Sequence, residues 1–220
     1  MLYGAMNSPV RPLIPELEEI HMLGFDYLEL TMDPPQAHHG TIRPQKKKLL
    51  KALKDFNMGL ICHLPSFVST ADLTESIREA SIKEVLASLE VAADLRPLKV
   101  VLHPSFIIGL GVLVMDQSRQ YAITSLEAIV EKADRLGLCL CLENMFPQSN
   151  ALVDAGDFME IFDRFPGLKM TLDIGHANIG SRGGERTLGF LERCQDRIEH
   201  VHVSDNLGKE DIHLPVGAGS

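Results

Sequence analysis

The stretch Thr171-Leu172-Asp173-Ile174-Gly175-His176 decides the fold. Its apolar beginning is typical of a buried β-strand, which ends on the carboxylate of Asp173, and the imidazole of His176 follows three residues later. In parallel α/β proteins the carboxyl ends of the strands open on one face, where sites form. The pair is therefore expected to meet polar side chains that follow other strands of the chain.

Polar side chains of ligand type lie at the ends of five successive predicted strands. Intervals of 40, 40, 30 and 29 residues separate them, so one falls in each unit of strand and helix. Because strand ends share one face of a barrel, we expect these side chains to converge. Asp211 and His213, in the loop after the last predicted strand, extend the set together with His176. The members at strand ends are His63, His103, Glu143, Asp173 and His202.

Strands and helices alternate along the whole chain, which indicates a parallel sheet and a TIM-type (β/α)8 barrel. A closed barrel of eight strands typically needs about 250 residues, so the eighth strand is expected to be missing from this chain of 220 residues. An open doubly wound sheet is the competing architecture, but no Gly-rich phosphate loop follows the first strand. The seven predicted strands cover 2–6, 27–30, 59–64, 99–102, 139–142, 170–172 and 199–203. The long helix predicted over 74–94 has Ile77, Ala80, Leu89 and Ala92 as buried candidates.

Composition narrows the class of protein. The chain carries 21 basic and 30 acidic residues, a net charge of -9, which gives no general attraction to nucleic acid or an anionic membrane. Bound divalent cations could still make one site locally positive, so DNA is not excluded. Without a membrane-length apolar run or a signal-peptide core, we expect a soluble cytoplasmic protein. Reduced, packed thiols are expected for all four cysteines, which are Cys62, Cys139, Cys141 and Cys194.

Side-chain alternation adds expectations about the barrel interior. Residues two apart on a strand share a face, so Cys139 and Cys141 should point the same way as Glu143 and fill the core. His200 should share the face of His202, and we favour a hydrogen-bonded interior histidine there over a metal ligand. Imidazoles and carboxylates together suit zinc, manganese or iron, whereas no cysteine follows a strand to make a thiolate zinc site.

The chain resembles the xylose isomerase-like TIM-barrel superfamily, which contains sugar phosphate isomerases and epimerases and the endonuclease IV group of AP endonuclease family 2. The resemblance covers essentially the whole chain and implies a single domain over residues 1–220 that is incomplete at its C-terminal end. Its carriers are His63 in HLPS, His103 in HPS, Glu143 in LEN, Asp173 and His176 in LDIGH, His202 in HVHVSDN, and Asp211 and His213 in DIHLPVGAG.

The isomerase branch of this superfamily implies one divalent metal, held by a Glu, an Asp, a His and a final Glu. The first three match Glu143, Asp173 and His202, and the fourth would follow an eighth strand, outside the 220 residues. In that chemistry the two glutamates move a proton at a carbon beside a carbonyl. The resemblance therefore implies a catalytic Glu143, and His176 would bind a substrate oxygen.

The endonuclease branch implies three zinc ions and abasic DNA as the substrate. It would use all eight positions as metal ligands, which are His63, His103, Glu143, Asp173, His176, His202, Asp211 and His213. Against this hypothesis, the loops at 32–35 and 64–67 carry little positive charge, whereas a bound duplex demands cationic contacts. The lysine-rich helix around 46–54 is expected on the outer wall of the barrel, where it is poorly placed to help.

The favoured hypothesis is a metal-dependent isomerase or epimerase with one to three ions and a small sugar-like substrate. Apurinic endonuclease activity is the alternative, and a barrel that binds a metabolite without turnover is a further one. No membrane partner is expected, and a homo-oligomer stays open. Specificity would come from loop residues such as His38, His39, Phe67, Phe106 and Phe146.

Overall fold

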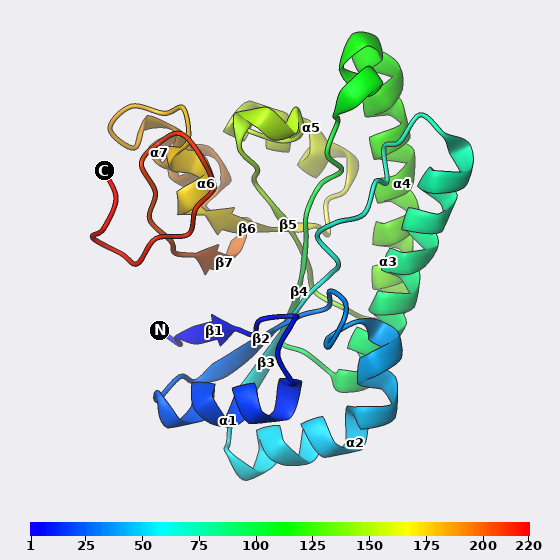
Figure 1. The fold of residues 1–220 in the computed structure, drawn as a ribbon. Coiled ribbons are helices and arrows are strands. Elements are labelled where there is room, and N and C mark those ends of the chain that lie inside the picture. Colours follow the sequence, from blue (N-terminus) through cyan, green and yellow to red (C-terminus); the bar gives the residue numbers. More distant parts are fainter.

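The protein forms one sheet of seven parallel strands, and each strand pairs with its neighbours in the sequence (Figure 1). The computed structural model describes residues 1–220. The order β1-β2-β3-β4-β5-β6-β7 is that of a barrel and not of a doubly wound sheet, in which the order reverses. The strands are β1 (Gly4–Met6), β2 (Tyr27–Thr31), β3 (Gly59–His63), β4 (Lys99–Leu102), β5 (Leu140–Glu143), β6 (Lys169–Asp173) and β7 (Ile198–His202).

Helices connect the strands and cover the outside of the sheet. Local sequence sets their ends: Gly137 follows the helix before β5 with a positive φ of 68°, as its position predicts, and Asp154 and Asp157 form a capping box before β6. The helices are α1 (Leu13–Met22), α2 (His39–Asp55), α3 (Glu75–Leu95), α4 (Met115–Arg135), α5 (Ala155–Arg164), α6 (Ile174–Asn178) and α7 (Glu185–Cys194).

Each strand points alternate side chains outward and inward, and the two faces differ in chemistry. Outward residues pack against the helices in one hydrophobic core, for example Leu28, Leu30 and Leu142. Inward residues near the strand ends are polar and buried, as Glu143 and Asp173 are. The hydrophobic core between the sheet and the helices therefore stabilises the sheet, and the inner face of the barrel can carry a polar centre.

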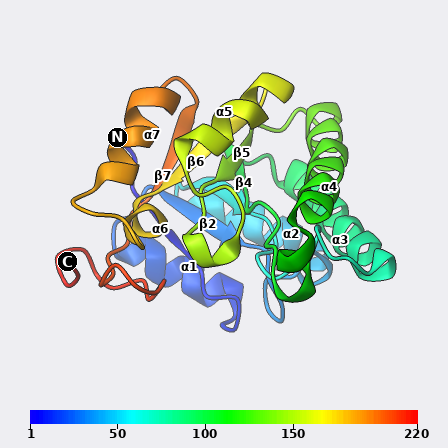
Figure 2. The same ribbon diagram turned by 90° about the horizontal axis from the view of Figure 1, so that it is seen from above.

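The sheet curls into an open barrel, one strand short of the closed TIM form (Figure 2). Its edges are β1 and β7, which line the two sides of a cavity of about 830 Å³. A register shift in β7 lies opposite Met170 and Thr171, so that His200 and His202 pair with Thr171 and Asp173. This shift keeps both histidines on the interior face, as alternation predicts.

Some local predictions were wrong. The Gly-containing segment before the helix at 115–135 is expected from its sequence to be a loop, but it contains a 3-10 helix, Gly109–Val114. The short helix α6, directly after β6, was also not predicted. Ile77 is 47% exposed and Ala80 is also exposed, because this end of α3 extends beyond the sheet that buries Leu89. No helix of the structure is both long enough and apolar enough to cross a membrane.

Candidate metal centre

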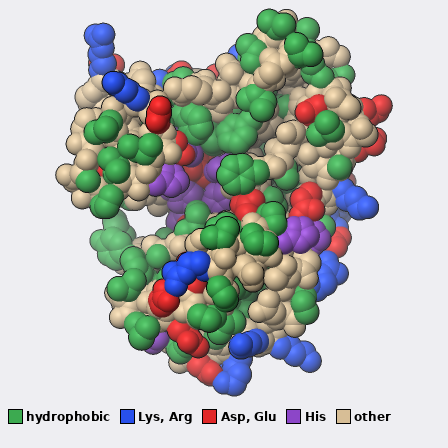
Figure 3. All heavy atoms as spheres, in the orientation of Figure 1, with side chains coloured by type: hydrophobic (Ala, Val, Ile, Leu, Met, Phe, Trp, Pro, Cys, Tyr) green, Lys and Arg blue, Asp and Glu red, His purple; other side chains and the backbone are tan.

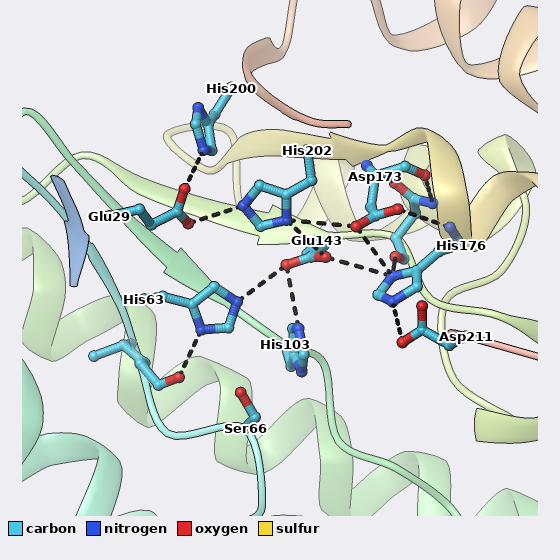
Figure 4. Close-up of polar contacts among 12 residues, drawn as sticks. Glu29, His63, Ser66, His103, Glu143, Asp173, His176, His200, His202 and Asp211 are labelled. Carbon is cyan, nitrogen blue, oxygen red and sulfur yellow. Dashed lines mark hydrogen bonds and ion pairs between the residues drawn. The ribbon is translucent and has the colours of Figure 1, made fainter. Parts of the chain in front are cut away.

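Glu143 lies at the middle of the polar centre, at the carboxyl end of β5 (Figure 4). Its side chain is only 1% exposed, and four histidines contact it. Oε2 lies 3.3 Å from Nε2 of His63 and 3.2 Å from Nε2 of His103. Oε1 lies 3.1 Å from Nδ1 of His202 and 3.4 Å from Nδ1 of His176. Strand ends far apart in the sequence thus meet at one carboxylate, as predicted.

Asp173 completes the inner part of this centre. Its Oδ2 lies 3.5 Å from Nδ1 of His202, which therefore faces the carboxylates of both Asp173 and Glu143. Its Oδ1 accepts a hydrogen bond of 2.7 Å from the backbone N–H of His176, because Asp173 is the N-cap of α6. One carboxylate therefore starts the helix and also faces the centre.

His176 connects the inner part of the centre to the C-terminal loop. Its Nδ1 lies 2.9 Å from the backbone carbonyl of Asn144, and this acceptor favours a proton on Nδ1. Nε2 then points toward Oδ2 of Asp211, at 3.2 Å, and Oδ1 of Asp211 lies 2.9 Å from Nε2 of His213. His213 is 64% exposed and forms the rim of the centre.

His63 and His103 approach Glu143 from β3 and from the residue after β4. Nδ1 of His63 lies 2.9 Å from the carbonyl of Leu64, which turns Nε2 toward the carboxylate. Nδ1 of His103 is buried and has no hydrogen-bond partner. A buried nitrogen without a partner is costly unless another group uses its lone pair or its proton. All eight predicted site residues are therefore brought into one contiguous cluster.

Glu29 is a further residue of the centre, and the strand-end pattern of the sequence does not predict it. It lies in the middle of β2, and its two oxygens contact Nε2 of His202 at 2.8 Å and Nε2 of His200 at 2.9 Å. The prediction that His200 is a hydrogen-bonded interior histidine is confirmed by this contact. A charged residue within the buried strand Tyr-Leu-Glu-Leu was the available signal, because a buried carboxylate needs a partner.

Burial and charge act in opposite directions on the pKa values of the centre. Burial raises the pKa of Glu143, but the charge of His202 and hydrogen bonds from His202 and His103 outweigh it and hold that pKa well below its ordinary range. Burial lowers the pKa of His103 itself, so His202 is the main source of the positive charge. Burial lowers the pKa of His202, yet Glu143 and Glu29 raise it well above the ordinary value. For His176, burial is outweighed by Asp211, Asp173 and Glu143, and its pKa rises to about 9. Without a metal, the cluster is thus a network of charged pairs.

The donor atoms fit divalent metal ions. Two ligands at about 2.0–2.1 Å from a tetrahedral zinc lie about 3.3 Å from each other. The contacts of His202 with Glu143 and Asp173, at 3.1 and 3.5 Å, bracket that separation. Three sets drawn from the predicted site residues meet the spatial requirement for a metal, and they are Glu143, Asp173 and His176; His63, Glu143 and His202; and His176, Asp211 and His213. A fourth set, Glu29, His200 and His202, shares His202 with them.

The loop residues considered for specificity divide into two groups. Phe146 packs edge-on against His176 with ring centres 5.2 Å apart, and Phe106 lies 6.1 Å from His103. Phe67 is 89% exposed. His38 and His39 instead contact Glu84 of α3 and belong to a separate cluster. Figure 3 shows the histidines of the centre at the bottom of a hollow that hydrophobic side chains border.

Fold and site together define a parallel α/β barrel protein in which histidines and carboxylates gather at the strand ends. A family described as xylose isomerase-like TIM barrel matches residues 17–220, and the chain belongs to this family. The uncharacterized protein MJ1311 of Methanocaldococcus jannaschii is 30% identical over all of this chain and 76% of its own length. A D-tagatose 3-epimerase-like protein of known structure is 27% identical, with a TM-score of 0.88 over all of this chain and 82% of that one.

More distant proteins that share the fold include an epimerase and an endonuclease. Fructoselysine 3-epimerase of Escherichia coli O157:H7 is 21% identical over 98% of this chain and 78% of its own length. The IOLI protein, solved with a zinc atom, has a TM-score of 0.79 at 18% identity over all of this chain and 81% of that one. Endonuclease IV of Thermus thermophilus has a TM-score of 0.72 at 16% identity over all of this chain and 83% of that one.

Proposed function

We propose that this protein is a divalent-metal-dependent isomerase or epimerase that moves a proton next to a carbonyl of a small sugar or sugar phosphate. The observation that carries the proposal is the convergence of two buried carboxylates, those of Glu143 and Asp173, on Nδ1 of His202. Carboxylates placed this close in a buried site repel each other unless positive charge lies between them. Without a metal, the protonated imidazole of His202 supplies that charge. A bound ion would supply it when His202 is neutral and its Nδ1 is a ligand.

Family membership supports a sugar-directed activity. The family is named for a sugar isomerase, a D-tagatose 3-epimerase-like protein shares 27% identity and nearly the same backbone, and a fructoselysine 3-epimerase aligns over almost the whole chain. The names of the two epimerases support one class of reaction, the inversion of a carbon beside a carbonyl. That class needs a carboxylate beside the substrate and a means to stabilise negative charge on the oxygen.

Glu143, Asp173 and His202 would hold the ion at the inner position. A divalent ion at that position would polarise the substrate carbonyl and lower the pKa of the neighbouring carbon acid. Glu143 would hold or move the proton at its carboxylate, as predicted, because it is the acidic side chain at the middle of the centre. His176 would bind a substrate oxygen through Nε2, since Nδ1 faces the carbonyl of Asn144.

The aromatic side chains beside the centre suit a small, partly apolar ring. Phe106 and Phe146 lie 6.4 Å apart between ring centres, next to His103 and His176. Such faces pack on the C–H side of a sugar and exclude water from the carbon that loses its proton. We therefore propose that the substrate binds on the side of the centre where Phe106 and Phe146 lie.

The alternative of abasic-DNA cleavage is favoured by one observation, that the eight predicted site residues contain three sets of possible metal donors. That number would suit a three-ion phosphodiesterase. The loops beside the centre argue against it, because residues 32–35 and 64–67 contain no lysine or arginine and the chain carries a net charge of -9. A DNA duplex with many phosphates would find few cations here, whereas a neutral sugar needs none and a sugar phosphate carries only one phosphate group.

The proposal is tested by metal content and by solvent exchange. Protein expressed without added chelator is analysed for zinc, manganese and iron, and D-fructose and D-tagatose are incubated with it in D₂O in the presence of each ion. We expect one tightly bound ion and metal-dependent deuterium incorporation, lowered about 10²–10⁴-fold by Glu143→Gln. The matched control Glu18→Gln, on the exposed side of α1, should exchange like the wild type.

Two outcomes would overturn the proposal. Incision of an abasic oligonucleotide that is lost in Glu143→Gln, together with three zinc ions per chain, would establish the endonuclease. Absence of exchange into every ketose and aldose tried, with bound sugar still detectable, would establish a barrel that binds a metabolite without turnover.

A further inference from the structure

Glu29 is a buried carboxylate outside the predicted ligand set. It lies in β2, is 4% exposed, and extends into the interior beneath the strand ends. Its Oε1 lies 2.8 Å from Nε2 of His202 and its Oε2 lies 2.9 Å from Nε2 of His200 (Figure 4). Each oxygen therefore contacts one ring nitrogen, and the residue forms a fork between two histidines of β7.

This fork decides which nitrogen of His202 carries a proton. An ionised carboxylate can only accept hydrogen bonds, so Nε2 of His202 must donate to it. In neutral His202 the lone pair is then on Nδ1, the nitrogen that faces Glu143 and Asp173. A lone pair directed at two carboxylates is unfavourable by itself and becomes favourable when a cation lies between the three atoms.

The same side chains could be interpreted as an additional metal site formed by Glu29, His200 and His202. The geometry favours hydrogen bonds instead. At 2.8 and 2.9 Å, both contacts have the length of charge-assisted hydrogen bonds, and the two histidines use different oxygens of the carboxylate. Ligands of one ion would instead converge on a shared point about 2.0–2.1 Å from each nitrogen.

The geometry points to Glu29 as a positioning residue that holds His202 as an Nδ1 ligand of the metal, with His200 anchoring the second oxygen of Glu29. The register shift in β7 contributes, because it places His200 and His202 on the face that Glu29 reaches. This inference rests on the metal centre of the proposed function but not on its sugar chemistry. Its tests measure metal affinity and histidine tautomers, which do not depend on turnover.

The main experiment compares Glu29→Gln with the wild type. The glutamine side chain has one acceptor atom, its carbonyl oxygen, and one donor group, its NH₂, so it cannot replace both carboxylate oxygens. The proton of His202 is then no longer fixed on Nε2. Loss of such a partner typically weakens metal binding about 10–100-fold. We expect that loss for Zn²⁺ and Co²⁺ in chelator competition, with the far-UV circular dichroism spectrum retained. Wild-type affinity in a folded Glu29→Gln protein would overturn the inference.

Two measurements keep the inference testable if Glu29→Gln does not fold. In ¹⁵N-histidine spectra of the wild type loaded with Zn²⁺, His202 should show protonated Nε2 and metal-bound Nδ1, and the reverse tautomer would overturn the inference. His200→Asn should keep metal affinity within about threefold, because the bond between Glu29 and His202 remains. Loss of one of two bound ions in His200→Asn would show a second metal site instead.

Discussion

The proposed metal donors at the strand ends differ from those of the C-terminal loop in how they are held. His63, Glu143 and His202 end paired strands, and their side chains are at most 14% exposed. Asp211 and His213 lie in a loop, with side chains 24% and 64% exposed. The strand donors are fixed by the ladder of the sheet, whereas the loop donors depend on a few local bonds.

Asp205 organises that loop. Its Oδ2 accepts hydrogen bonds of 2.9 Å from the backbone N–H groups of Gly217 and Gly219, and its backbone pairs with Leu214. The side-chain amide of Asn206 donates a hydrogen bond of 2.7 Å to the carbonyl of Gly175, two residues after Asp173. The difference suggests two roles: the strands supply a rigid inner centre, and the loop supplies an adjustable rim that can change without unfolding the barrel.

The largest expected effect comes from Asp173→Asn, which separates charge from structure in the strand region. Asparagine retains the N-cap of α6, but the centre loses one negative charge. We expect metal affinity to fall by about 3 kcal/mol or more, roughly a hundredfold or more, because one partner of a buried charged group is removed. Isothermal titration with Zn²⁺ measures it. An affinity within threefold of wild type would remove Asp173 from the ligand set.

A smaller effect is expected when only the rim is disturbed. A Cβ on Gly219 would collide with Oδ1 of Asp205 and with the backbone carbonyl of Asn206, so the loop must move in Gly219→Ala. We expect faster amide hydrogen exchange over 211–219, an inner-site metal affinity within about threefold of wild type, and nearly the same global unfolding temperature. A large loss of inner-site affinity would show that rim and strands form one unit.

The smallest expected effect is a pH dependence of the metal-free protein. The pKa of His176 is raised to about 9 from 6.5, with Asp211 among the causes. Because the pKa of His176 is higher in the folded state than in the unfolded state, the ion pair of His176 with Asp211 stabilises the fold fully below pH 6.5. This stabilisation is lost as the pH rises through about 9. In chelator, the unfolding temperature of the wild type should therefore fall more steeply over this range than that of Asp211→Asn. Parallel curves would contradict the assignment.

Much of the centre could be predicted from the sequence because strand ends obey simple rules. Residues that follow buried strands share one face, so His63, His103, Glu143, Asp173 and His202 could be grouped without a structure. The roles of metal ligand and catalyst assigned to them stay predictions. Glu29 could not be predicted in this way because it lies in the middle of β2 and not at the end of the strand. Ile77 was wrongly placed in the core because helical spacing does not tell how far a helix extends beyond the sheet.

The sequence by itself determined the alternation of strands and helices, the two chemically distinct faces of each strand, and the family. Those features depend on residues near each other in the chain, where spacing and propensity act. The tertiary structure decided which nitrogen faces which carboxylate, and it paired Glu29 with His202, 173 positions apart. Contacts across a barrel follow from the curvature and register of the whole sheet, and no local pattern contains them.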